Sequence, residues 1–211
     1  MGKFEVGVLG NFDGKIGTVV GAKWKGIEYM RHKGRKSKKP PTAAQLEQQA
    51  KFKCVIRFVN AMTNVLSVGY PDLLKKTALN QAFSDIYAKA LNGTYPSFSL
   101  DYSKVSISKG VLHNANAPVA SAAGNGVIKF SWNDNSDGNV ANRDDKSVLA
   151  MYCPELDEVV YTLSGAQRDT GTASLNVMNY TGMLVETWIA FISADGKLVS
   201  SSRYTGQLTV S

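Results

Sequence analysis

The segment Thr187–Val210, TWIAFISADGKLVSSSRYTGQLTV, decides the C-terminal half of the fold. β-branched and aromatic residues gather in two runs, Leu184–Ser193 and Leu198–Val210, and the pair Asp195–Gly196 between them is typical of a tight turn. The segment therefore predicts a β-hairpin, with an interruption in its second strand.

Five similar runs, separated by turn residues, precede this hairpin: Lys104–Ser108, Val127–Trp132, Ser147–Tyr152, Glu158–Leu163 and Ala173–Val177. Seven short strands with regular turns predict a small Greek-key sandwich. The final hairpin resembles that of a fibronectin type III or immunoglobulin-like domain, and Trp132 stands in an early strand, where such domains often keep a core tryptophan. The resemblance implies a sandwich fold and no particular activity, because such sandwiches host many functions.

Upstream of the strands, apolar residues recur with the period of two helices. The first helix is expected to begin after Thr42 and to run to about Val68, and its wide apolar surface predicts a helix covered on two sides. Gly69 is a stop signal. The second helix is expected over Pro71–Leu91, ended by Asn92–Gly93, so that the two form an antiparallel helical hairpin.

The N-terminal segment cannot form a core of its own. Glycines divide it into short pieces, of which Ile16–Val20, Ala22–Trp24 and Ile27–Met30 predict strands joined by sharp turns and lacking a visible partner. The run His32–Pro41, HKGRKSKKPP, is self-repelling and extended, which predicts a linker or contact arm. We therefore expect an α+β protein of three parts: a basic Gly-rich β arm and linker over 1–41, a helical hairpin over 42–100, and an immunoglobulin-like β-sandwich over 101–211.

A longer pattern runs through the arm. G-x-x-G-x-x-x-G-x-x-W-K-G-x-x-x-x-R is formed by Gly14, Gly17, Gly21, Trp24, Lys25, Gly26 and Arg31, and a T-x-x-Q-x-x-x-x-x-x-F helix start follows at Thr42, Gln45 and Phe52. This layout resembles a bacterial family catalogued as a domain of unknown function. The resemblance spans nearly the full length and implies no activity, substrate or cofactor.

The net charge of +7 is unevenly distributed along the 211 residues. Residues 1–60 carry thirteen Lys/Arg and four Asp/Glu, a net of +9; residues 61–110 carry five and three, a net of +2; residues 111–211 carry six and ten, a net of −4. A basic N-terminal part and an acidic C-terminal part favour one of two partners: a polyanion, or the acidic part of another copy of the chain.

Two apparent ligand loops fail on detail. The segment Gly10–Gly17 has three residues between its glycines where a phosphate loop needs four, and Ile16 follows the lysine. The segment Asn133–Asp144 aligns loosely with a calcium loop, but it begins with Asn, ends with Asp, and lies between expected strands. A solvated loop explains the same residues, so calcium binding stays open.

No catalytic, cofactor-binding or metal-binding residues are predicted. The two histidines form no evident Ser–His or Cys–His pair, and two cysteines, Cys54 and Cys153, allow no disulfide framework, so buried free thiols and a non-enzymatic protein are expected. No apolar stretch has the length of a membrane span, so no membrane insertion is expected. The missing apolar N-terminal run predicts a cytoplasmic location, with a released or extracellular assembly as the alternative.

The sequence thus favours a structural protein that self-associates with other copies of itself through its arm and first helix, as in a filament or virion-like particle. Strand addition and apolar contacts would use Ile16, Val19, Val20, Phe52, Ile56 and Val59. The first alternative is sequence-independent nucleic-acid binding. For either partner, the expected contact residues are Lys23, Trp24, Lys25, Tyr29, Arg31, Lys33, Arg35, Lys36, Lys38 and Lys39. The second alternative is an adhesion or ligand-binding module that uses the sandwich loops.

Overall fold

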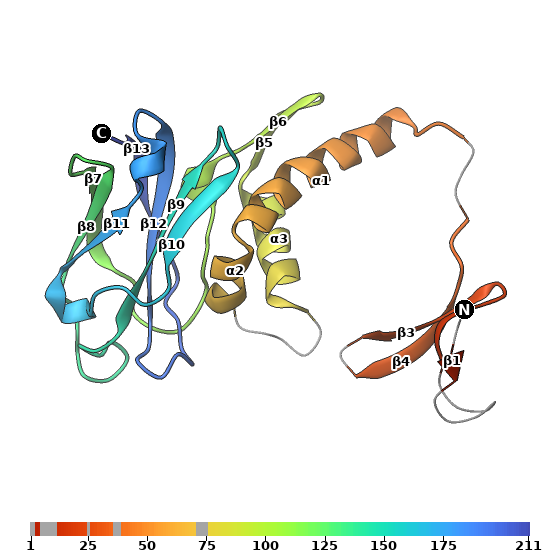
Figure 1. Ribbon diagram of the computed structural model, residues 1–211, viewed down its shortest axis with the longest axis horizontal. Coiled ribbons are helices and arrows are strands. Elements are labelled where there is room, and N and C mark those ends of the chain that lie inside the picture. The colour runs from red at the N-terminus through yellow and green to blue at the C-terminus, as the bar shows by residue number, and fades with distance from the viewer. Residues whose placement is uncertain (1–2, 5–11, 25, 36–38, 71–75) are drawn as a thin grey trace. The chain divides into compact units, whose positions relative to one another are not determined.

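The computed structural model describes residues 3–4, 12–24, 26–35, 39–70 and 76–211. The chain divides into two compact units, residues 1–42 and residues 43–211. Figure 1 shows the elements of each unit. The expected mixture of helices and antiparallel strands is confirmed.

The first unit is a four-stranded antiparallel sheet in the order β1–β2–β3–β4. Its strands are β1 (Lys3–Phe4), β2 (Phe12–Ile16), β3 (Val19–Trp24) and β4 (Ile27–His32). The expected strand Ile16–Val20 is wrong, because the turn Gly17–Thr18 lies at its centre and Gly17 has a φ of +58°. The strand pieces also pair with one another in this unit, so the expectation that they lack a partner is wrong.

The second unit begins with three helices, α1 (Ala43–Ala61), α2 (Thr63–Gly69) and α3 (Ala78–Lys89). The helix expected to continue to Val68 is broken at Met62. The break follows from Thr63, whose hydroxyl donates to the carbonyl oxygens of Val59 (3.2 Å) and Asn60 (2.8 Å) and so competes with the helical backbone for these acceptors.

Helices α1 and α3 run antiparallel, as expected. Tyr87 donates its hydroxyl to the Gln48 side chain (2.8 Å), and one turn further along the rings of Phe52 and Phe83 lie 5.0 Å apart. Helix α3 starts later than the sequence suggested: Thr77 is its N-cap and accepts a hydrogen bond from the Asn80 N–H (3.3 Å). Of the expected second helix, residues 71–75 lie outside the described residues.

Helix α2 ends at Gly69, as its stop signal predicted, although the reason is close packing. A side-chain carbon at this position would lie 2.2 Å from the carbonyl oxygen of Ile107, so only glycine fits here. Asn92–Gly93 does not end a helix. It lies in a two-stranded hairpin, β5 (Leu91–Thr94) and β6 (Ser97–Leu100), that the sequence analysis missed.

The remaining strands form two antiparallel sheets. A three-stranded sheet has the order β11–β8–β7, and a four-stranded sheet has the order β10–β9–β12–β13. The strands are β7 (Asn116–Ala122), β8 (Val127–Asn133), β9 (Lys146–Cys153), β10 (Glu158–Thr162), β11 (Thr172–Asn176), β12 (Leu184–Ile192) and β13 (Arg203–Thr209).

The expected strands from Val127 to Ser193 are confirmed. Of the last expected strand, Leu198–Val210, residues 203–209 form β13, whereas Val199 and Ser200 form isolated bridges. The pairing of β13 with β12 shifts register between Thr187 and Trp188. The expected strand Lys104–Ser108 is wrong. A 3-10 turn over Tyr102–Lys104, capped by the Asp101 carboxylate, takes its beginning, and the first strand of the two sheets is instead β7.

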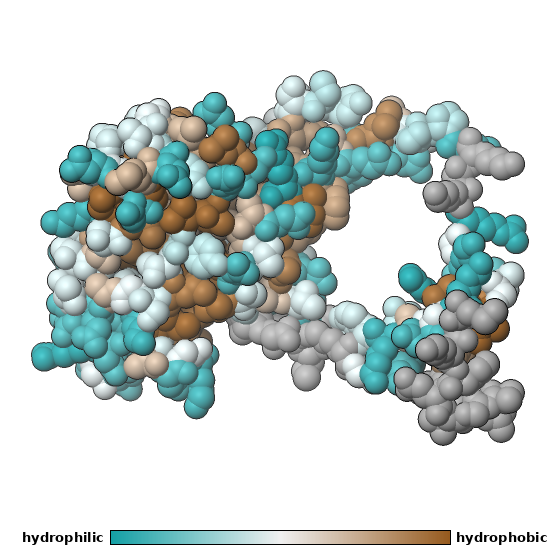
Figure 2. Space-filling view, viewed as in Figure 1, coloured by the Kyte–Doolittle hydropathy of each residue, from teal (hydrophilic) through white to brown (hydrophobic). Residues whose placement is uncertain are grey.

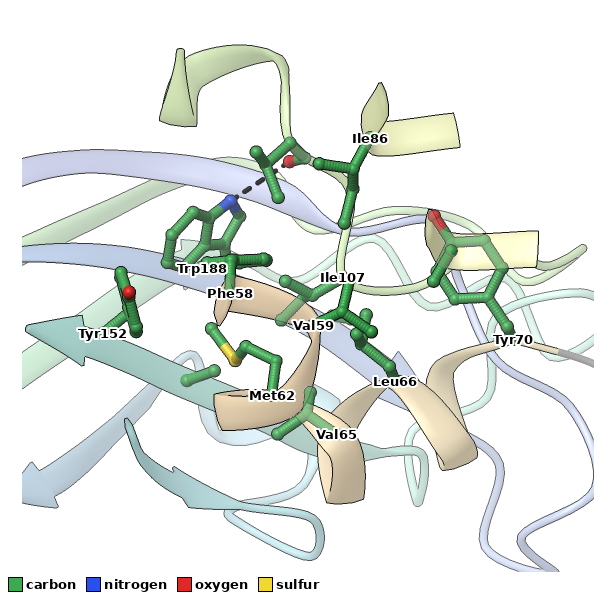
Figure 3. Close-up of a cluster of buried hydrophobic side chains, with 14 of the residues drawn as sticks. Phe58, Val59, Met62, Val65, Leu66, Tyr70, Ile86, Ile107, Tyr152 and Trp188 are labelled. Carbon is green, nitrogen blue, oxygen red and sulfur yellow. Dashed lines mark hydrogen bonds between the residues drawn. The ribbon is translucent and has the colours of Figure 1, made fainter. Parts of the chain in front are cut away.

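Strands β9 and β12 are buried on both faces, which explains their almost unbroken apolar sequence. Their even-numbered residues, such as Ala150 and Trp188, pack in one cluster with the helices (Figure 3), whereas odd-numbered residues, such as Leu149 and Ile189, pack in a second cluster with β8 and β11. Trp188 also donates its indole N–H to the carbonyl oxygen of Val105 (3.1 Å). The four-stranded sheet is therefore the middle layer of this unit.

Candidate functional site

The open edge of the arm sheet exposes large apolar side chains. Strand β4 pairs with β3 alone among the described residues, and every residue of β4 is exposed. The exposed fractions of the side chains are 63% for Ile27, 71% for Met30 and 45% for Tyr29, with Trp24 on the neighbouring strand at 42%. Figure 2 shows brown, apolar residues at the surface of this sheet among teal, polar ones. An apolar edge of this kind is unusual on a protein that stays a monomer.

The three arm residues predicted for self-association lie at the centre of the sheet. Ile16 and Val19 face each other across the first turn, and Val20 pairs with Lys15. All three side chains are half-buried. The exposed edge is therefore formed by other apolar residues of the arm, Ile27 and Met30.

The basic residues of the arm line a cleft. A hollow of about 490 Å³ is lined by Lys15, Gly17, Thr18, His32, Lys33, Gly34 and Arg35, without an acidic residue among them. Lys33 and Arg35 were expected as contact residues from the sequence, whereas Lys15, which the β2–β3 turn brings to the same hollow, was not.

The other predicted contact residues do not gather at one place in the arm. Lys23 forms an ion pair with Glu28 across β3 and β4 (3.2 Å). Arg31 is exposed on β4, and Lys39 is exposed in the linker. Lys25, Lys36 and Lys38 lie outside the described residues.

Helix α1 offers a second apolar surface in its N-terminal half. Phe52 is 52% exposed although its ring contacts Phe83, and Leu46 is 40% exposed. Ile56 is half-buried, and Val59 is 2% exposed because it belongs to the core shared with the sheet. Of the three helix residues predicted for self-association, Phe52 is thus the one that presents most surface.

A groove of about 650 Å³ runs beside this half of α1. The helix, the β5–β6 hairpin and the turn between β9 and β10 form its walls, and the lining residues are Leu46, Gln49, Ala50, Lys53, Cys54, Arg57, Phe58, Tyr95, Pro96, Phe98, Ser99, Leu100, Tyr102, Tyr152, Pro154 and Asp157. Five aromatic rings and two prolines are among the sixteen lining residues, which suits contact with a chain segment or a planar group.

The polar groups of the groove are engaged with one another. The Arg57 guanidinium pairs with the Asp157 carboxylate, which also accepts a hydrogen bond from the Tyr152 hydroxyl (2.8 Å). The Cys54 thiol donates to the carbonyl oxygen of Phe98 (3.6 Å), and burial raises the pKa of Cys54 above its usual value. Burial likewise raises the pKa of Tyr102 to about 12. At neutral pH the groove therefore holds a thiol and neutral tyrosines rather than an activated nucleophile.

One oxygen of the loop that resembled a calcium site is engaged by an arginine. The Arg168 guanidinium donates to Asn135 Oδ1 in the loop (2.9 Å) and, outside the loop, to the Asp145 carboxylate (3.0 Å) and the carbonyl oxygen of His113 (3.1 Å). Asp137 accepts hydrogen bonds from the backbone of its own loop, including the N–H of Ala141 (2.9 Å).

Within the described ranges, no group of three or more His, Cys, Asp or Glu side chains is placed to hold a metal ion. Over the same part of the chain, no helix combines the length and the apolar character needed to cross a membrane.

The model of a protein family matches residues 11–206 of the chain, and the description of this family is "Family of unknown function (DUF6266)". This match confirms the resemblance inferred from the glycine-rich pattern to a family of unknown function. No curated protein matches the chain.

Proposed function

Because the chain belongs to this family of unknown function (DUF6266), we propose a function from its surfaces: a non-enzymatic structural subunit that self-associates to build an assembly such as a filament or particle. The observation that carries the proposal is the exposed apolar edge of β4. Natural sheets usually protect an edge with charges, proline or a covering element, because open backbone groups recruit another strand. Strand β4 also carries Glu28, Arg31 and His32, but the apolar surface of Ile27, Tyr29 and Met30 between them is suited to that recruitment.

In this proposal the second unit is the rigid body of the subunit, with an immunoglobulin-like or fibronectin type III-like sandwich at its C-terminal end. Counted from β7, the first, second and fifth strands (β7, β8 and β11) form one sheet. The third, sixth and seventh strands (β9, β12 and β13), with the fourth (β10) at the edge, form the other. This partition of strands supports the assignment, as does the 5% exposure of Trp132 on the second strand. The exposed half of α1, with Leu46 and Phe52, supplies a further contact surface.

Light scattering of the full chain tests self-association. We expect a mass above the 22.8 kDa of the monomer for the wild type and a shift towards 22.8 kDa for the double variant Ile27→Lys, Met30→Lys. Val111→Lys is the matched control, because Val111 is 70% exposed and lies in the second unit. A monomeric wild type at concentrations of about 100 μM, which is well above the dissociation constants of stable assemblies, would refute the proposal.

The basic cleft favours nucleic-acid binding as a second candidate function. Lys15, Lys33 and Arg35 converge on it and are suited to neutralise the phosphates of a single strand without reading its sequence. We expect retention on an oligonucleotide that falls steeply with salt. The triple variant Lys15→Ala, Lys33→Ala, Arg35→Ala should flatten the slope of log K against log salt by about 2. Absence of retention at low salt rejects this candidate.

A further inference from the structure

We propose that β4 pairs antiparallel with β4 of a second copy, with Met30 facing Met30 at the two-fold axis. This inference rests on the proposed self-association and names its contact. It joins two four-stranded arm sheets into one continuous sheet of eight strands.

The phase of the β3–β4 ladder decides which backbone groups of β4 are open. The N–H of Lys33 donates to the carbonyl oxygen of Thr18 (2.8 Å), so Lys33 bonds inward to β3. Residues of an antiparallel strand alternate between inward and outward backbone groups. The N–H and C=O groups of Glu28, Met30 and His32 therefore point away from β3, towards the open edge.

These three residues limit the possible registers. A two-fold axis perpendicular to the sheet keeps each side chain on the same face in both copies, so odd-numbered residues face odd-numbered ones and even-numbered residues face even-numbered ones. Two such registers overlap five residues of β4. One is centred on Met30 and the other on Tyr29.

The register centred on Met30 sets each charged side chain opposite a group that can interact with it. It places Glu28 of each copy opposite His32 of the other, and Tyr29 opposite Arg31, so that each copy contributes an acid facing an imidazole and a guanidinium facing an aromatic ring. Glu28 is already held on the same face by Lys23, at 3.2 Å.

The register centred on Tyr29 is less favourable. It sets the Glu28 carboxylate opposite the Met30 thioether and the Arg31 guanidinium opposite Ile27, so neither charge gains a partner. The partners available to Glu28 and Arg31 therefore select the register centred on Met30.

Disulfide trapping in the full chain tests the register. Across a hydrogen-bonded antiparallel pair the Cα atoms lie about 5.5 Å apart, which a disulfide spans, so Met30→Cys is expected to give a covalent dimer under mild oxidation. Ile27→Cys is the matched control: its exposure is similar, 63% against 71%, but the two copies of residue 27 lie about 20 Å apart in this register. Tyr29→Cys probes the other register, and the wild type reports on Cys54 and Cys153. Non-reducing electrophoresis and intact mass provide the readout.

The outcomes distinguish the register, the pairing of β4 and the proposed self-association from one another. A covalent dimer of Met30→Cys, at least tenfold more abundant than that of Ile27→Cys or Tyr29→Cys, supports the register. A dimer of Tyr29→Cys instead overturns the register. A multimeric wild type in light scattering without any of these cross-links overturns the pairing of β4 but leaves the proposed function standing. A monomeric wild type overturns both.

Discussion

Arg168 is a charged side chain with no exposure to solvent, and its packing depends on its partners. Its guanidinium pairs with the equally buried Asp145 and stacks over the ring of Phe191, 3.9 Å from the ring centre. Its carbonyl oxygen accepts the indole N–H of Trp132 (2.7 Å). One residue thus connects the loop before β9 with the core between the two sheets.

We expect Arg168→Met to lower the free energy of unfolding by about 3–5 kcal/mol, because it leaves the Asp145 carboxylate buried without its partner. Arg143→Met is the control from the loop that holds Asp145, and its exposed side chain predicts a change within about 0.5 kcal/mol. Urea denaturation measures both. Equal midpoints for the two variants would show that the buried pair adds nothing.

Asp137 makes the stability of the folded protein depend on pH in the acidic range. The backbone N–H groups of Ala141 and Asn139 hold the pKa of its carboxyl below the ordinary value of 3.8. A carboxyl with a depressed pKa in the folded state stabilises the protein above its unfolded pKa, and this contribution is lost as the pH falls through the folded value. We therefore expect the thermal midpoint of the wild type to fall more steeply below about pH 4 than that of Asp137→Asn. Parallel curves for the two proteins between pH 7 and pH 2.5 contradict the prediction.

At the scale of elements, helix α1 has an exposed N-terminal half and a buried C-terminal half. Phe58 is 1% exposed and contacts the rings of Tyr152 and Trp188, whereas Phe52 on the same helix is 52% exposed. We expect Phe58→Ala to cost about 3–5 kcal/mol of stability, because it opens a cavity in the core, and Phe52→Ala to cost about 1 kcal/mol or less. Chemical denaturation of both variants checks this. Similar losses would contradict the division of α1 into a buried half and an exposed half.

The sequence predicts elements well where burial leaves a strong pattern. Strands β9 and β12 are apolar along their whole length because both faces are covered, and this pattern is visible without a structure. Strand β7 was missed because its residues, NAPVASA, include three alanines and a proline and contain one β-branched residue. The β5–β6 hairpin was missed because Asn92–Gly93, which lies within β5, is typical of a helix end, while the turn is formed by Tyr95 and Pro96.

The candidate site was less accessible to sequence reasoning. A helix that is apolar over most of its surface does not reveal which side is covered, so Val59, now in the core, was grouped with Phe52. The strand Ile27–Met30 was expected, but the residue pattern does not show which strand of a sheet lies at its open edge, so Ile27 and Met30 were not named as contact residues. Lys15 joins the basic cleft through a turn whose geometry the residue pattern alone does not specify.

At the scale of the whole molecule, charge separates the two candidate functions. Residues 1–42 carry ten Lys/Arg and three Asp/Glu, a net of +7, so two arms that pair also repel each other. Salt screens this repulsion, whereas it weakens phosphate binding. We expect self-association to strengthen between 0.05 and 0.5 M salt, about one order of magnitude in ionic strength, and oligonucleotide binding to weaken over the same range. Sedimentation velocity and fluorescence anisotropy measure the two; self-association that weakens with salt contradicts the first expectation.

The alternating backbone of β4 has a consequence for isotope exchange. The amide hydrogens of Tyr29 and Arg31 are bonded within the sheet, whereas those of Glu28, Met30 and His32 face the open edge, so in an isolated copy the second set should exchange with deuterium far faster than the first. In a paired copy, both sets become protected, and the outward amides exchange at the rate at which two copies separate. The doubly covered strand β12, whose amides open only with the whole fold, supplies the slow reference in the same spectrum. Residue-resolved hydrogen exchange along the six residues of β4 would then measure the lifetime of the assembly.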